Sequence, residues 1–221
     1  LFYPMLSYLF TSPLYFLIYA AAILIAITVH EFAHAWMANR LGDPTARLAG
    51  RISLNPLVHL DPLGTLALLI LRFGWGKPVP FDPYNLQNPR KDSALISFAG
   101  PAANLILATL LAGIVRLGHL FFNPNFAYML EIIITPFVFL ALTLAIFNLL
   151  PFHPLDGGKI IVGLLPEKLA YQWDEILQRF GFFLVIFLIL PLFGGYSLVS
   201  LIIFPIIKGL LNLLLPGSPL V

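Results

Sequence analysis

Two histidines and a glutamate stand at the end of a long apolar stretch. His30, Glu31 and His34 follow residues 14–29, which contain nothing more polar than tyrosine and one threonine. On a helix, histidines four residues apart share a face, so both imidazoles can bind one zinc ion while Glu31 reaches a water on it. Burying these side chains without partners is costly in an apolar span. The pattern predicts metal-assisted hydrolysis; the alternative is that the three groups only hydrogen-bond neighbouring helices.

A catalytic zinc ion takes three protein ligands and keeps one position open for water. The chain has no cysteine, so histidine and carboxylate are the available ligands. Beyond the first two histidines, the candidates are Asp156, His153 and His59. Asp156 is favoured because two glycines follow it and allow a close approach of the chain to the ion. Charge agrees, because zinc with Glu31 and Asp156 is neutral, whereas His153 in place of the aspartate leaves one positive charge.

The composition is that of a polytopic membrane protein. Hydrophobic residues make up 60% of the chain and charged residues 10%, and the mean hydropathy is +0.94, beyond the range of soluble globular domains. We expect an all-α fold of about four to six transmembrane helices in the lipid bilayer, organised as a single domain over residues 1–221. The net charge is +2 without a basic patch, so nothing indicates a nucleic-acid partner.

Hydropathy and turn residues divide the chain into membrane helices and links. The expected helices are residues 14–39, 93–117 and 131–150, then a short helix at 159–165, and one broken or two short spans at 180–192 and 196–215. Residues 45–54 alternate imperfectly, which predicts a short strand or hairpin whose edge could hold an unwound substrate; an interfacial loop is the alternative. Residues 64–71 are expected to be re-entrant or interfacial. Residues 1–10 are too short to span and lack the features of a signal peptide, and we interpret them as the end of a helix.

Charge in the links orients these helices. The link from residue 40 to 92 carries seven lysines and arginines, whereas the link from 118 to 130 carries none. The positive-inside rule therefore places the first link in the cytoplasm. The first and third helices then both run inward, and His30, His34 and Asp156 lie near their cytoplasmic ends at similar depth. Pro151 and Pro154 interrupt the chain before Asp156, which predicts irregular backbone at a site.

Several longer motifs resemble the site-2 protease family of intramembrane zinc metalloproteases, in its compact prokaryotic branch without a PDZ domain. They are HEFAH at 30–34, ISLNPLVHLDPLGT at 52–65, GWGKPVPFDP at 74–83, FAGPAAN at 98–104 and FNLLPFHPLDGG at 147–158. The resemblance implies one zinc ion per chain, bound by His30, His34 and Asp156, with Glu31 as the catalytic base and Asn148 beside the substrate carbonyl. It further implies transmembrane protein substrates and a multi-pass protein of a prokaryotic cell membrane.

Of two polar residues in these motifs, Asn104 follows the family pattern and His153 departs from it. Asn104 ends a motif that recurs in the family, and small residues before it also suit close helix packing. His153 stands where the family more often has a small or apolar residue or a proline. The sequence alone gives no role to His153 or His59, and it does not indicate the oligomeric state or the natural substrate.

Other function classes fit the same residues less well. A transporter could bind a divalent ion at the broken helix around Pro151, but it has no need of a glutamate beside paired histidines. A prenyl-protein endopeptidase would take a glutamate as third ligand, and none of the later glutamates has a companion motif. Serine proteolysis is disfavoured because Ser93 and Ser97 lie in no nucleophile motif.

Overall fold

A computed structural model describes residues 9–71, 74–190 and 197–216, and in them the chain is almost entirely helical. The order is α2 (Pro13–Arg40), α3 (Thr45–Leu48), α4 (Pro62–Leu71), α5 (Pro89–Phe121), α6 (Pro124–Asn148), α7 (Asp156–Leu164), α8 (Glu167–Ile189) and α9 (Leu198–Leu214), with short 3-10 turns at Pro56–Val58 and Pro83–Asn85. The described residues contain no sheet, only an isolated bridge between Leu60 and Gly76. The interpretation of residues 1–10 falls mostly outside the described part.

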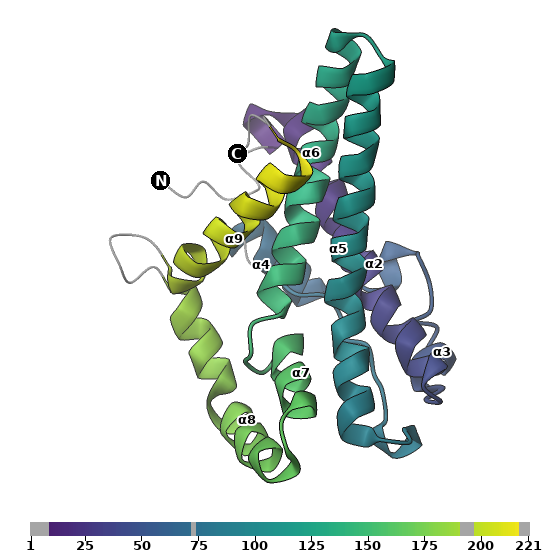
Figure 1. The fold of residues 1–221 in the computed structure, drawn as a ribbon, viewed down its shortest axis with the longest axis vertical. Helices are drawn as coiled ribbons and strands as arrows, with labels where there is room; N and C mark the ends of the chain where they lie inside the picture. Colours follow the sequence, from purple (N-terminus) through teal and green to yellow (C-terminus); the bar gives the residue numbers. More distant parts are fainter. Residues whose placement is uncertain (1–8, 72–73, 191–196, 217–221) are drawn as a thin grey trace.

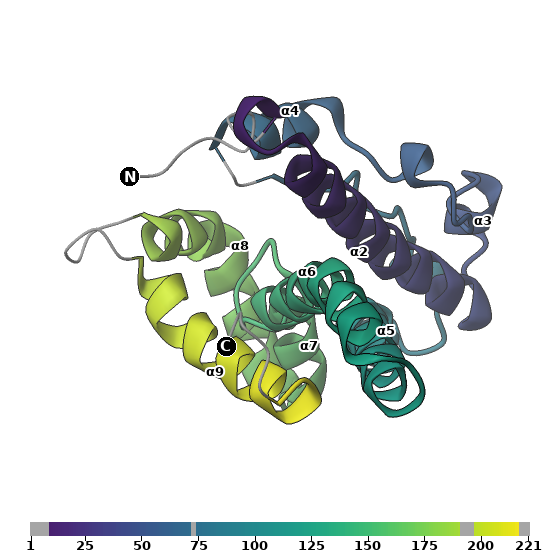
Figure 2. The same ribbon diagram turned by 90° about the horizontal axis from the view of Figure 1, so that it is seen from above.

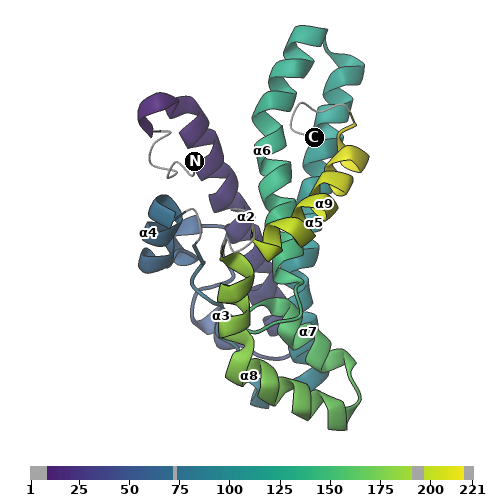
Figure 3. The ribbon, with the colours of Figure 1, turned by 90° about the vertical axis from the view of Figure 1, so that its left-hand side faces the viewer.

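Helices α5 and α6 form the centre of the molecule as a long antiparallel pair (Figure 1). Seen from above, α2, α3 and α4 lie on one side of this pair, and α7, α8 and α9 lie on the other (Figure 2). Figure 3 shows α4 beside α2, on the side facing away from α5 and α6. Helix α5 contacts both α2 and α7, and it thereby connects the two sides at the level of the predicted site.

Small residues let the central helices pack closely. Ala108 and Ala112 of α5 and Ala141 of α6 are buried together, and Ile203 and Ile207 of α9 complete this apolar cluster. Helix α6 begins at residue 124, earlier than the predicted 131. The side chain of Asn123 accepts a hydrogen bond from the backbone N–H of Phe126 and so caps the earlier start, as N-cap residues do.

Three described helices, α2, α5 and α6, are long and apolar enough to cross a membrane. The expected count of about four to six is therefore not confirmed. The difference lies in the C-terminal third of the chain, where α9 has 17 residues and α8 begins in a polar segment, at Glu167. Residues 167–179, which lie between the helices expected at 159–165 and 180–192, form the N-terminal half of α8.

The predicted strand or hairpin at residues 45–54 was wrong. Residues Thr45–Leu48 form a helical turn, and residues 49–54 are irregular. Asp43 causes this, because its carboxylate accepts hydrogen bonds from the backbone N–H of Thr45, at 3.1 Å, and from the Thr45 hydroxyl. Such a bond starts a helical turn and competes with a strand. The expected substrate-binding edge at 45–54 is therefore not formed.

Residues 64–71, expected as a re-entrant or interfacial segment, lie in the short apolar helix α4.

Candidate metal centre

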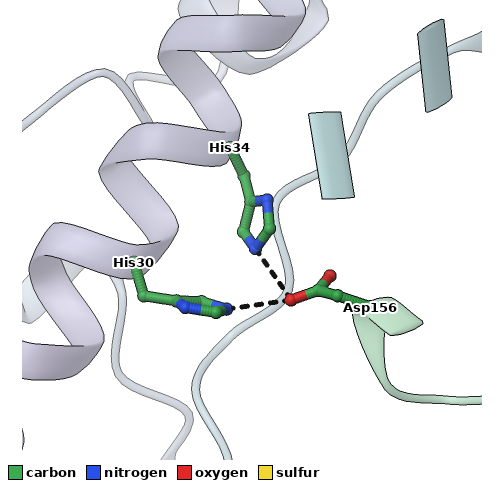
Figure 4. Close-up of side chains that lie close together, drawn as sticks. All are labelled: His30, His34 and Asp156. Atoms are coloured by element: carbon green, nitrogen blue, oxygen red, sulfur yellow. Dashed lines mark hydrogen bonds and ion pairs between the residues drawn. The ribbon is translucent and has the colours of Figure 1, made fainter. Parts of the chain in front are cut away.

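His30, His34 and Asp156 converge although they come from opposite sides of the central helix pair. His30 and His34 project from consecutive turns of α2 toward Asp156, the first residue of α7 (Figure 4). The Oδ2 atom of Asp156 lies 3.1 Å from Nε2 of His30 and 3.3 Å from Nε2 of His34. Two ligands of one tetrahedral zinc ion are separated by roughly 3.3–3.5 Å. The spacing of the three ligand atoms, all within 4.8 Å of one another, therefore fits a single ion.

Hydrogen bonding at His34 provides an independent test of whether a cation fits here. Nδ1 of His34 lies 2.7 Å from the backbone carbonyl oxygen of Ile96 in α5. A carbonyl oxygen only accepts, so Nδ1 carries the proton and a neutral His34 presents the lone pair of Nε2 to Asp156. Two acceptors then face each other at 3.3 Å. A proton or a metal cation between them relieves this repulsion, so the donor set fits a metal ion.

One stripe of α5 backs both histidines. Ile96, Gly100 and Asn104 are spaced four residues apart, so they lie along one face of the helix. Ile96 contacts His34, and the Asn104 amide lies 3.4 Å from Nδ1 of His30. A Cβ atom at Gly100 would lie 2.4 Å from Nε2 of His34 and 2.7 Å from Cε1 of His30. Glycine at this position therefore admits both imidazole rings between the helices.

Asp156 is positioned by the break between α6 and α7. Helix α6 ends at Asn148, and the chain turns before α7 begins at Asp156. A Cβ atom on Gly157 would lie 2.1 Å from the carbonyl oxygen of Leu150 and 2.5 Å from that of Leu149. Only glycine permits this contact, which fixes the start of α7 against the end of α6 and directs Asp156 toward α2.

Glu31 faces the segment that follows α4. Its Oε1 atom lies only 3.3 Å from where a Cβ atom of Gly76 would be. Arg51, which is 4% exposed, donates hydrogen bonds to the carbonyl oxygens of Lys77 and Pro78 and so holds this segment in place. Burial lowers the pKa of Arg51, and the negative charge of Glu31 acts in the opposite direction. The carboxylate of Glu31 thus lies beside the backbone of Gly76, in the segment that Arg51 holds.

The other candidates from the sequence have different partners. Nε2 of His153 lies 3.1 Å from Oδ1 of Asp174 in α8. His59 is fully buried, with Nε2 2.7 Å from the carbonyl oxygen of Ser53. Asn148 donates its amide N–H to the carbonyl oxygen of Leu144 in its own helix, at 2.9 Å. The structure thus groups Asp156 with the two histidines, while the roles of all these residues as ligands or catalysts stay predictions.

Sequence reasoning did not find the contribution of Ile96 and Gly100. Ile96 acts through its backbone carbonyl, to which its side chain gives no clue. Gly100 lies in a run of small residues that ordinary helix packing explains equally well. The four-residue spacing between Gly100 and Asn104 was the available signal, because it places both residues on one helix face.

Comparison with known proteins adds independent information. The chain matches the model of one family, Peptidase family M50, over residues 18–128 and 111–188. A Bacillus subtilis protein named "Putative zinc metalloprotease YwhC" is 37% identical over 179 residues, covering 80% of this chain and 81% of that protein. A Mycolicibacterium smegmatis protein named "Putative zinc metalloprotease Rip2" is 36% identical over 190 residues, covering 79% of this chain and 67% of that protein. No solved structure matches.

Proposed function

Because the chain belongs to peptidase family M50, the family of site-2 proteases, we propose that it cleaves peptide bonds in or near transmembrane segments of membrane proteins. Membership makes it a metalloprotease, and three apolar helices make it a multi-pass integral membrane protein. The observation that carries the proposal is the grouping of His30, His34 and Asp156 beside Glu31. We further propose one zinc ion per chain at this site.

The proposed chemistry is hydrolysis by an activated water. A zinc ion held by His30, His34 and Asp156 would lower the pKa of a bound water to about 7 and polarise the scissile carbonyl. Glu31 removes the proton from the attacking water and later delivers it to the leaving amine. Hydrolysis consumes one water and yields a new carboxylate and a new amine, so Glu31 ends the cycle as it began.

Other residues would position the substrate and the base. The backbone of residues 76–78, which Arg51 holds beside Glu31, brings fixed peptide groups close to the proposed base. Asn148 lies at the C-terminal end of α6, before the turn that leads to Asp156. Its amide is bonded within its own helix, so it would have to rotate away from Leu144 to donate to a substrate carbonyl, as proposed.

The distribution of charge supports an orientation for the proposed enzyme. Seven lysines and arginines lie between residue 40, the last of α2, and residue 91, in the first turn of α5, whereas residues 118–130, around the turn from α5 to α6, contain none. By the positive-inside rule, the link after α2 lies in the cytoplasm. The proposed site, near the C-terminal end of α2, then opens toward the cytoplasmic side of a prokaryotic cell membrane.

Substitution of Glu31 by glutamine tests the proposal. The variant keeps both histidines and Asp156, so we expect zinc content equal to that of the native protein. Cleavage should fall by roughly 10²–10⁴-fold, the contribution of a positioned general base. The measurement is zinc content and cleavage of a panel of single-span substrates by purified protein in detergent. Native turnover by the glutamine variant, or by protein stripped of metal with a chelator, would falsify the proposal.

A further inference from the structure

Asn104 is an unexplained buried polar residue at the metal centre. Its side chain is completely buried, and its Oδ1 atom has no hydrogen-bond partner among the residues that the structure describes. Its Nδ2 atom lies 3.4 Å from Nδ1 of His30. Leaving a buried amide oxygen unpaired is costly, so a fully buried asparagine at this position calls for an acceptor role that the present contact does not show.

The orientation of the amide is coupled to the proton on His30. With Nδ2 directed at His30, Nδ1 of His30 must accept, and the proton of the neutral ring lies on Nε2, toward Asp156, 3.1 Å away. That tautomer cannot bind a metal through Nε2, because the lone pair is occupied. The contact as it stands therefore belongs to a ring that is not prepared for a metal.

Rotation of the Asn104 amide by 180° exchanges the donor and the acceptor in its contact with His30. Oδ1 of Asn104 then accepts a hydrogen bond from the Nδ1–H of His30, and Nε2 presents its lone pair to the ligand cluster. Such exchanges of amide oxygen and nitrogen leave the shape of the side chain unchanged. The rotation also gives Oδ1 the partner that it lacks. His34 has the same arrangement already, with Nδ1 on the Ile96 carbonyl and Nε2 facing Asp156.

We infer that Asn104 is a positioning residue that selects the metal-binding tautomer of His30 by accepting its Nδ1 proton through Oδ1. This inference rests on the proposed metal centre. It gives α5 two equivalent acceptors, the Ile96 carbonyl for His34 and the Asn104 amide for His30, on either side of Gly100. Groups that accept the second proton of a metal-binding histidine fix the orientation of the ring and raise its affinity for the metal.

Two substitutions of similar size separate this role from helix packing. Asn104→Leu removes the acceptor, and we expect zinc affinity to fall roughly 10–100-fold, as for other lost hydrogen-bond partners of metal ligands. Asn104→Asp keeps an oxygen acceptor and removes the amide donor, so it should bind zinc within about threefold of the native protein or more tightly. The zinc dissociation constant is measured by chelator competition on metal-free protein in detergent, and the visible spectrum of the cobalt-substituted protein reports ligand geometry.

The pattern of results distinguishes the inference from the metal centre itself. Native zinc affinity in Asn104→Leu, or equal loss in both variants, overturns the role of Asn104 while His30→Ala still loses zinc. Native zinc affinity in His30→Ala overturns the metal centre and the inference together. If Asn104→Leu does not fold, as judged by thermal unfolding of the metal-free protein, Asn104→Asp decides alone: retained affinity supports the acceptor role and lost affinity overturns it.

Discussion

At the scale of single residues, Gly100 determines how closely α5 approaches the histidines of α2. The absent side chain leaves room for both rings, since a Cβ atom would lie less than 3 Å from each of them. Glycine normally destabilises the interior of a helix by about 0.5–1 kcal/mol relative to alanine. Glycine at this position therefore fits a requirement for space at the proposed metal centre. Alanine should stabilise the helix and impair function.

Comparison of Gly100→Ala with Gly113→Ala separates the effect on function from the effect on helix stability. Both glycines lie inside α5, but a Cβ atom at Gly113 would have no neighbour within 4 Å in the described part of the chain. We expect Gly100→Ala to lower zinc affinity and cleavage by roughly 10–100-fold, because the methyl group displaces the rings of two ligands. Gly113→Ala should keep both and unfold at a slightly higher temperature. Full zinc binding by Gly100→Ala would show that the helices can separate at no cost.

At the scale of elements, one buried carboxylate organises the link between α2 and α5. Asp43 is fully buried and accepts hydrogen bonds from Thr45, from the backbone N–H of Asp82 at 2.8 Å and from the Asn85 amide at 2.8 Å. Burial raises the pKa of Asp43, but these hydrogen bonds outweigh it and hold the pKa below the ordinary value of 3.8. The carboxylate thus joins the end of α2 to the segment that precedes α5.

Asp43 explains why the sequence predicted the wrong element at residues 45–54. Alternation of apolar residues was the local signal for a strand. Asp43 forms the local bonds to Thr45 that start the helical turn. Its carboxylate is held in turn by Asp82 and Asn85, 39 and 42 residues further along the chain, and no local pattern reveals these contacts. Tertiary contacts override weak strand preferences. The end of α2, by contrast, was predicted at Asn39 and lies at Arg40, because Gly42, with φ of 105°, marks a helix end within the local sequence.

Stability should depend on the ionisation of Asp43. A carboxylate whose pKa is lower in the folded protein stabilises it above the ordinary pKa, and this contribution is lost as the pH falls through the folded pKa. Asp43→Asn should therefore lower stability by about 1–3 kcal/mol at pH 7, a decrease in Tm of roughly 2–10 °C. The difference from the native protein should shrink as the pH is lowered from 4 to about 2.

The matched control for Asp43 is Asp82→Asn, which keeps the side-chain oxygen that accepts from the backbone N–H of Tyr84 at 2.9 Å. Its backbone N–H still reaches Asp43, so Tm at pH 7 should change by less than roughly 2 °C. Thermal unfolding in detergent from pH 7 to about pH 2 provides the comparison. Equal effects of the two substitutions, or a loss at Asp43 that does not vary with pH, would contradict the assigned role.

At the scale of the whole molecule, the proposed metal centre is formed by two chain segments that lie 126 residues apart at His30 and Asp156. The sequence predicted this convergence because helix direction and charge in the links placed both segments at one membrane surface. It also predicted the three long helices, because hydropathy is a strong signal over twenty residues. The count of further spans was not confirmed, because α8 mixes a polar half with an apolar half, and hydropathy alone does not reveal where such a helix begins.

Helix α8 contacts the loop that leads to Asp156, and His153 provides the connection. Its Nε2 atom pairs with Asp174 of α8, which also accepts from the Gln178 amide at 2.7 Å. A Cβ atom on Gly181 of α8 would lie 2.4 Å from the carbonyl oxygen of His153. These contacts direct the imidazole of His153 toward α8, so we expect it to support the loop and not to bind the metal.

Substitutions of Asp156 and His153 separate the proposed third ligand from the residue that supports its loop. Asp156→Ala removes the carboxylate that lies within 3.3 Å of both histidines, and zinc content and cleavage should both be lost. His153→Ala should retain zinc and part of the activity, because it removes only the contact with Asp174. Asp174→Asn should resemble His153→Ala if that contact is the whole of its role. Zinc stoichiometry of the purified variants provides the measurement. Loss of zinc in His153→Ala with retention in Asp156→Ala would instead make His153 the third ligand.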